Sequence, residues 1–136
     1  MRVLVDTNVV LDVLLKREPW VTEAMAVWQA NDEGRIVGYL MASAITDIFY
    51  AARRLAGREI ARTAVRTCLE AFELCIVDRQ ALEQAEALPG NDFEDNLQIA
   101  CAIIAGVDAI VTRNTEDFKA STIPVLTPAE LLARLR

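Results

Sequence analysis

Four acidic residues of this chain occur where catalytic carboxylates are commonly found. Asp6 directly follows a short apolar run over residues 2–5. Three further acids stand at comparable points along the chain: Asp47, Asp95 and Asp117. The chain contains no histidine, which excludes Ser-His-Asp and Cys-His catalysis. If this is an enzyme, its chemistry depends on carboxylates, and a site with only oxygen ligands prefers hard cations such as Mg²⁺ or Mn²⁺.

Each of these acids also has a purely structural interpretation. Asp6 could cap the helix that begins after it, and Asp47 could be a solvated charge on a helix. Asp95 could stabilise a helix N-terminus through the helix dipole, and Asp117 could be a turn residue. Asp92 fits an N-cap better than a site. The other aspartates interpreted as caps, turns or surface residues are Asp12, Asp32, Asp78 and Asp108.

The elements that must position these acids alternate between strands and helices. Apolar runs predict strands at residues 2–5, 36–41, 74–77, 109–112 and 123–126. Helical spacing predicts a helix after residue 7 and others at residues 19–32, 43–56, 58–72, 79–88, 92–106 and 129–135, with breaks at Gly57 and Gly106. This order indicates an α/β fold with three layers, α/β/α, around a mostly parallel sheet of four or five strands. The carboxyl ends of parallel strands share one edge, so acids distant in sequence could meet there.

Length and composition indicate one globular domain, residues 1–136. A hydrophobic fraction of 54% excludes a disordered chain. No apolar run approaches the roughly 18 residues of a membrane helix, and the chain enters a strand at once without a signal peptide. We therefore expect a soluble, cytoplasmic protein. The three cysteines, Cys68, Cys75 and Cys101, lie in apolar surroundings and are expected to be buried thiols rather than zinc ligands.

The charge distribution restricts where nucleic acid could bind. With 14 basic and 20 acidic residues the net charge is −6, so binding to nucleic acid would have to be local. Four arginines spaced four residues apart would form a basic stripe if they lay on one helix; they are Arg54, Arg58, Arg62 and Arg66, with Arg53 beside them.

The acidic residues lie in stretches that resemble the motifs of the PIN domain family. This family consists of small metal-dependent nucleases and includes the VapC-type toxins of bacterial toxin–antitoxin pairs. Its first motif is similar to LVDTNVVLDVL and its second to ASAITDIFYAARR. Its third and fourth are similar to DFEDNLQIACAIIAGVDAIVTRNTEDF. The resemblance extends from residue 3 to residue 118 and so covers nearly the whole chain.

The resemblance implies a role for each matching residue. Asp6, Asp47 and Asp95 would be the central catalytic carboxylates, and Asp117 the more variable fourth. Asp6 and Asp95 would be the main metal ligands, with Asp47 and Asp117 holding a second metal or orienting water. Two departures from the pattern are an aspartate at 47, where glutamate is more common, and an asparagine at 114, where many members have aspartate. The supporting polar residues would be Thr7, Asn8, Thr112 and Asn114.

The implied function is that of a Mg²⁺- or Mn²⁺-dependent endoribonuclease, the toxin of a toxin–antitoxin pair. The implied partners are an RNA substrate, a cognate antitoxin and a second copy of the chain in a homodimer. The RNA backbone would be held by Arg53, Arg54, Arg58 and Arg62, although these could equally form a solvated helix face.

Two other functions remain open from the sequence. The first is a catalytically inactive PIN-like module that only binds a partner. The second, less favoured, is an aspartate-based phosphotransfer enzyme. One such type needs a second aspartate two residues after the first, where this chain has Asn8, and another needs a lysine after a late strand. The chain has only two lysines, Lys16 and Lys119, and neither fits.

Overall fold

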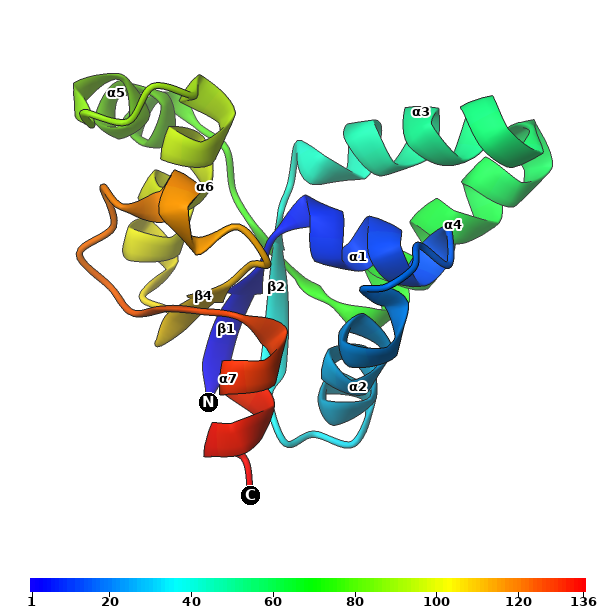
Figure 1. The fold of residues 1–136 in the computed structure, drawn as a ribbon. Coiled ribbons are helices and arrows are strands. Elements are labelled where there is room, and N and C mark those ends of the chain that lie inside the picture. Colours follow the sequence, from blue (N-terminus) through cyan, green and yellow to red (C-terminus); the bar gives the residue numbers. More distant parts are fainter.

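The structure is a computed structural model that describes residues 1–136 and contains a five-stranded, all-parallel sheet (Figure 1). The strands lie in the order β3-β2-β1-β4-β5, so the first strand occupies the centre. Their bounds are β1 (Arg2–Val5), β2 (Val37–Met41), β3 (Glu73–Cys75), β4 (Ala109–Val111) and β5 (Val125–Leu126). The predicted α/β class is confirmed, and the sheet is parallel throughout.

Seven α-helices cover the two faces of the sheet (Figure 1). One face packs against α1 (Thr7–Leu14), α2 (Val21–Asp32), α3 (Ala44–Ala56), α4 (Arg58–Ala71) and α7 (Pro128–Arg134). The other packs against α5 (Arg79–Ala87) and α6 (Phe93–Ala105). A short 3₁₀ helix, η1 (Thr115–Phe118), follows β4. No helix has both the length and the apolar character that a membrane span needs.

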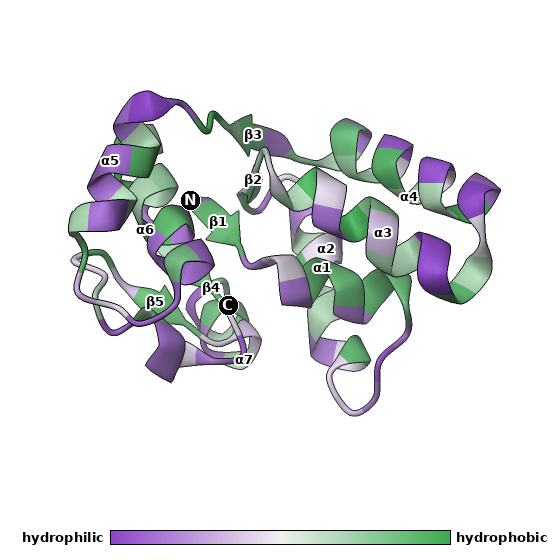
Figure 2. Ribbon diagram, turned by 90° about the horizontal axis from the view of Figure 1, so that it is seen from above, coloured by the Kyte–Doolittle hydropathy of each residue, from purple (hydrophilic) through white to green (hydrophobic).

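Strand β1 separates two hydrophobic cores. Val3 and Val5 belong to the core under α1–α4, whereas Leu4 faces the core under α5 and α6. All three side chains are buried, as expected for a central parallel strand. On α4 the buried residues Ala61, Ala64 and Cys68 recur every three to four positions, so hydrophilic and hydrophobic residues alternate along this helix (Figure 2).

The three cysteines are free and buried, as predicted. Burial raises the pKa of the Cys68 and Cys75 thiols to about 11 each and that of Cys101 to about 12. These thiols are therefore protonated at neutral pH and contribute to packing rather than to nucleophilic chemistry.

Several predicted boundaries were wrong. Helix α2 begins at Val21 rather than at Pro19, and β3 ends at Cys75, level with the end of its neighbour β2 at Met41. Strand β5 has only two residues, because the Ile123 N–H donates to the Ser121 hydroxyl in a local turn instead of to a strand. The 3₁₀ helix η1 was not predicted at all.

Gly38, in β2, has no room for a side chain. A Cβ atom at this position would lie 2.7 Å from Cδ1 of Phe72 and 3.2 Å from Oδ1 of Asn31. The Asn31 side chain accepts a hydrogen bond from Gly38 N and donates one to Ala71 O. The close approach of these groups fixes α2 and the end of α4 against the sheet.

We expect Gly38→Ala to lower the free energy of unfolding by about 1–3 kcal/mol, because the added methyl group must displace Phe72. Denaturant unfolding measures the loss. Val37→Thr, at the exposed neighbouring position of β2, is the control and should change stability far less. Equal stability of the parent protein and Gly38→Ala would contradict this view of the packing.

Candidate active site

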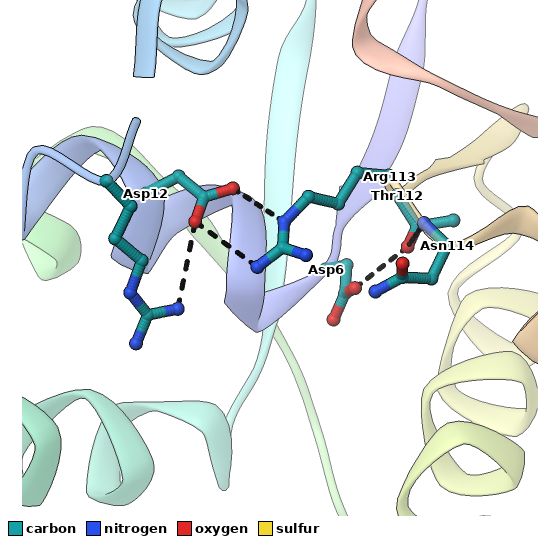
Figure 3. A network of polar contacts seen from close by, with 6 residues as sticks. Asp6, Asp12, Thr112, Arg113 and Asn114 are labelled. Atoms are coloured by element: carbon teal, nitrogen blue, oxygen red, sulfur yellow. Dashed lines mark hydrogen bonds and ion pairs between the residues drawn. The ribbon is translucent and has the colours of Figure 1, made fainter. Parts of the chain in front are cut away.

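Asp6 lies buried at the carboxyl end of β1, with 4% of its surface exposed. Its N–H donates to Val111 O at 2.9 Å and so continues the contact between β1 and β4. Its carboxylate accepts hydrogen bonds from Gln98 Nε2 at 3.1 Å and from Thr112 Oγ1 at 2.8 Å, the latter drawn in Figure 3. The side chain makes no capping bond to α1, so the interpretation of Asp6 as a helix cap is wrong.

Asp95 lies in the first turn of α6 among other acids. Its pKa is raised from 3.8 to about 7, first by burial and then by the charges of Asp92, Asp6, Asp117 and Glu94. Asp92 caps the helix by accepting a hydrogen bond from Asp95 N at 3.0 Å, as its sequence position suggested. The structure thus brings three of the four predicted site acids within electrostatic range of one another: Asp6, Asp95 and Asp117.

Asp117 lies on η1, at an open cleft of about 420 Å³. The cleft is also lined by Asp95 and Asp92 from the start of α6, and by the turn at residues 89–91. Glu116 is turned to the solvent, where it pairs with Lys119 at 2.8 Å. The cleft is therefore polar and acidic, and its only lysine is already engaged by a carboxylate.

Asp47 is placed differently from the other three acids. It is exposed in the first turn of α3 and shares a second hollow with Thr46, Phe93 and Glu94. Its charge raises the pKa of Glu94, where burial is the larger cause, but it is absent from the charges that act on Asp95. Glu94 is thus the acid on which the charges of both Asp47 and Asp6 act, and its own charge acts on Asp95.

Sequence reasoning missed two residues of this region, Glu94 and Gln98. Glu94 directly precedes Asp95, and this adjacency was the available signal. Gln98 lies one turn after Asp95 on α6 and is 1% exposed. Its Oε1 atom is buried without a hydrogen-bond partner, while its Nε2 holds Asp6.

The four predicted supporting residues take different positions. Thr112 is fully buried and donates to Asp6, and it accepts a hydrogen bond from Asn114 N at 3.1 Å. Thr7 is buried beside Asp6 in sequence, and its hydroxyl has no partner. Asn8 is half-buried in α1 and makes no side-chain hydrogen bond.

The donor atoms at this site are all oxygens, the ligands that Mg²⁺ and Mn²⁺ prefer. No three acidic side chains stand close enough together to hold one ion. Mg²⁺ in proteins commonly uses only one or two carboxylates and keeps several waters. The crowded carboxylates and the unpartnered Gln98 Oε1 therefore fit a largely hydrated ion rather than one enclosed by side chains.

The predicted RNA-binding arginines lie away from this cleft, toward the far end of the α3–α4 hairpin (Figure 1). Arg53 and Arg54 are in the last turn of α3, and Arg58 and Arg62 are on α4. Gly57, with φ of +90°, separates the two helices, which confirms the break predicted at this glycine. The condition for a single basic stripe, that the arginines lie on one helix, is therefore met only for those on α4. All four arginines are exposed, and none forms an ion pair.

A comparison of the sequence with known families identifies the family of this chain. The pattern that defines the PIN domain family matches residues 2–116. The match covers most of the chain, and the protein belongs to this family. No curated protein matches the chain.

Solved structures share this fold. A toxin–antitoxin complex from Klebsiella pneumoniae aligns with a TM-score of 0.69 and 22% identity over 93% of this chain and 97% of that one. VapBC2 from Rickettsia felis, bound to a promoter DNA fragment, aligns with a TM-score of 0.67 and 14% identity over 93% of this chain and 98% of that one. VapC20 from Mycobacterium tuberculosis, a toxin that cleaves the sarcin–ricin loop, aligns with a TM-score of 0.64 and 16% identity over 79% of this chain and 86% of that one. The chain therefore has the fold of VapC toxins.

The raised pKa of Asp95 predicts how the stability of the metal-free protein depends on pH. Between about pH 4 and pH 7 the unfolded chain has lost the Asp95 proton while the folded chain keeps it. The folded state then binds more protons, so stability falls as the pH rises through this range. In Asp95→Asn this fall should be smaller, by a few degrees in Tm.

Thermal unfolding in a chelator at pH 4 to 8 measures this effect. Asp32→Asn, at an exposed position in the last turn of α2, is the matched control and should keep the pH profile of the parent protein. An Asp95→Asn protein with that same profile would contradict the proposed crowding of charges.

Proposed function

We propose that this protein is a metal-dependent endoribonuclease and the toxin of a toxin–antitoxin pair. The observation that carries the proposal is the crowding of Asp6, Asp95 and Asp117 at the carboxyl edge of the sheet. Burial first, and then the charges of its acidic neighbours, raise the pKa of Asp95 to about 7. Acids that destabilise one another in this way are typical of functional sites, because a bound cation relieves the repulsion. Membership of the PIN domain family supports the same function.

Asp6 and Asp95 would hold Mg²⁺ or Mn²⁺. The ion would lower the pKa of a bound water and stabilise negative charge on the leaving oxygen. Asp6 is kept in one orientation by its donors Thr112 and Gln98. Asp95 must lose its proton on binding, since a carboxylate is the better ligand. Asp117 faces the same cleft and would orient water or hold a second ion.

Asp47 and Glu94 have a less central role in this proposal. They lie at the neighbouring hollow, where they could bind a second ion or accept hydrogen bonds from the substrate. Asp47 has the shorter of the two side chains and is not coupled to Asp95. We therefore expect its replacement to reduce activity less than replacement of Asp6.

The partners we propose are an RNA substrate, a cognate antitoxin and a second copy of the chain, all in the cytoplasm. The similar structures include toxin–antitoxin complexes, and one is of a toxin that cleaves the sarcin–ricin loop. The free arginines of the α3–α4 hairpin would contact phosphates of the RNA, since the net charge of −6 confines such contacts to local basic regions.

The main test is cleavage of an RNA panel with Mg²⁺ or Mn²⁺. We expect the parent protein to cleave, to lose activity on chelation and to regain it when metal is returned. Asp6→Asn should reduce activity on the order of a hundredfold or more, as loss of a key electrostatic group does. Mg²⁺ should raise the Tm of the parent protein by mass action but that of Asp6→Asn much less.

Asp32→Asn serves again as the matched control and should behave like the parent protein. Two results would overturn the proposal. One is full activity after exhaustive chelation. The other is a parent protein that binds RNA or an antitoxin but cleaves nothing with either metal, which would favour the inactive binding module instead.

The arginines allow a separate test of RNA binding. Replacing Arg53, Arg54, Arg58 and Arg62 together by alanine should weaken RNA binding and flatten its dependence on salt, because fewer counterions are released. The Tm shift caused by Mg²⁺ should persist, since the carboxylates are untouched. Replacing Arg35 and Arg79 by alanine provides a control away from the hairpin. If the fourfold variant binds RNA with the parental affinity and the parental dependence on salt, these arginines form a solvated helix face and do not bind RNA.

A further inference from the structure

Asp12 is a buried acid that the candidate site does not use. It lies on α1 and its side chain is 1% exposed, so its interpretation from the sequence as a cap, turn or surface residue is wrong. Arg113 donates from Nε to Asp12 Oδ2 at 2.9 Å, and its Nη2 lies 3.5 Å from Oδ1. Figure 3 shows the contact between Arg113 and Asp12. Arg17 is a more distant partner of Asp12, at 3.7 Å. A carboxylate buried this deeply is stable only when it is paired, so the pair with Arg113 is a structural requirement.

Arg113 is also held from a second direction. Its guanidinium lies over the ring of Trp20, 3.8 Å from the centroid, in cation–π contact. Asp12 belongs to α1, Trp20 to the turn before α2, and Arg113 to the loop after β4. The arginine therefore joins three segments at the same edge of the sheet as Asp6.

The loop that Arg113 fixes also carries groups of the candidate site. Its neighbour Thr112 donates to Asp6, and the N–H of Asn114 donates to the Thr112 hydroxyl at 3.1 Å. The carbonyl of Asn114 accepts from Asp117 N at 3.0 Å. The residue before Arg113 is therefore bonded to Asp6, as Figure 3 shows, and the residue after it is bonded to Asp117.

We propose that Arg113 is a positioning residue, held by Asp12 and Trp20 so that Thr112 orients the Asp6 carboxylate and η1 presents Asp117 to the cleft. Arg113 is not itself a catalytic residue in this proposal, because its charge is engaged by Asp12. The proposal rests on the nuclease function, and it assigns the Asp12–Arg113 pair a role beyond stability.

The test compares Arg113→Gln and Asp12→Asn with the parent protein, well below the Tm of each. Mn²⁺ affinity, measured by electron paramagnetic resonance of the free ion, should fall on the order of tenfold, as when supporting partners of ligands are removed. RNA cleavage should lose kcat while KM stays within about twofold, because positioning affects the reacting groups rather than RNA binding. The double variant should be no worse than either single variant, since both break one pair.

Arg17→Gln is the matched control. It removes another arginine from the same aspartate but has no bond to the loop after β4, so Mn²⁺ affinity and kcat should stay within about twofold of the parent protein. Arg113→Lys keeps the charge but loses the planar fork and the stacking on Trp20. Arg113→Lys should lose less Mn²⁺ affinity and less kcat than Arg113→Gln. It replaces Arg113→Gln in the test if Arg113→Gln does not fold.

Hydrogen exchange at the Asn114 amide gives a measurement that needs neither metal nor RNA. This amide should exchange faster in Arg113→Gln and Asp12→Asn and at the parental rate in Arg17→Gln. Variants that lose stability but keep parental Mn²⁺ affinity, kcat and Asn114 exchange would overturn the proposal and leave a purely structural ion pair. If the parent protein binds Mn²⁺ but cleaves no RNA, the nuclease function fails, while Mn²⁺ affinity and amide exchange still decide the role of Arg113.

Discussion

Burial of the Asp6 carboxylate at the end of the central strand constrains much of the structure around it. A buried carboxylate requires hydrogen-bond donors. Asp6 receives them from Thr112, the residue after β4, and from Gln98 on α6. The register of β1 and β4 pairs Val5 with Val111, which places the next residue of each strand, Asp6 and Thr112, side by side. The central position of β1 in the sheet thus determines where the candidate site lies.

The same arrangement carries an electrostatic penalty. Asp95, at the start of α6, lies near the other acids, and its pKa is raised to about 7 by burial first and then by their charges. The N-terminus of α6 offsets part of this through its dipole, and the Asp92 cap strengthens that terminus. The protein therefore retains a strained group of acids where packing alone would favour neutral residues, as expected when function opposes stability.

The basic residues are distributed in a way that complements the acidic site. Arg113, which directly follows Thr112, is already paired with Asp12. The unpaired arginines Arg53, Arg54, Arg58 and Arg62 lie on the α3–α4 hairpin instead. A polyanion would thus meet repulsion at the cleft and attraction at the hairpin, and its phosphates could approach the acids only with cations present.

The sequence by itself determined the alternation of strands and helices, the parallel sheet and the family, because apolar periodicity and short motifs are local properties of the chain. It also predicted that Asp6, Asp95 and Asp117 would lie near one another, because acids that follow strands or begin helices can be recognised from the sequence alone. Only the tertiary structure decided that Asp47 stands apart with Glu94 and that Gln98 holds Asp6. Asp12 and Arg113 are 101 residues apart, and no local pattern predicts their contact. Burial and pairing between distant segments depend on how the layers pack, which a single sequence does not encode at any one position.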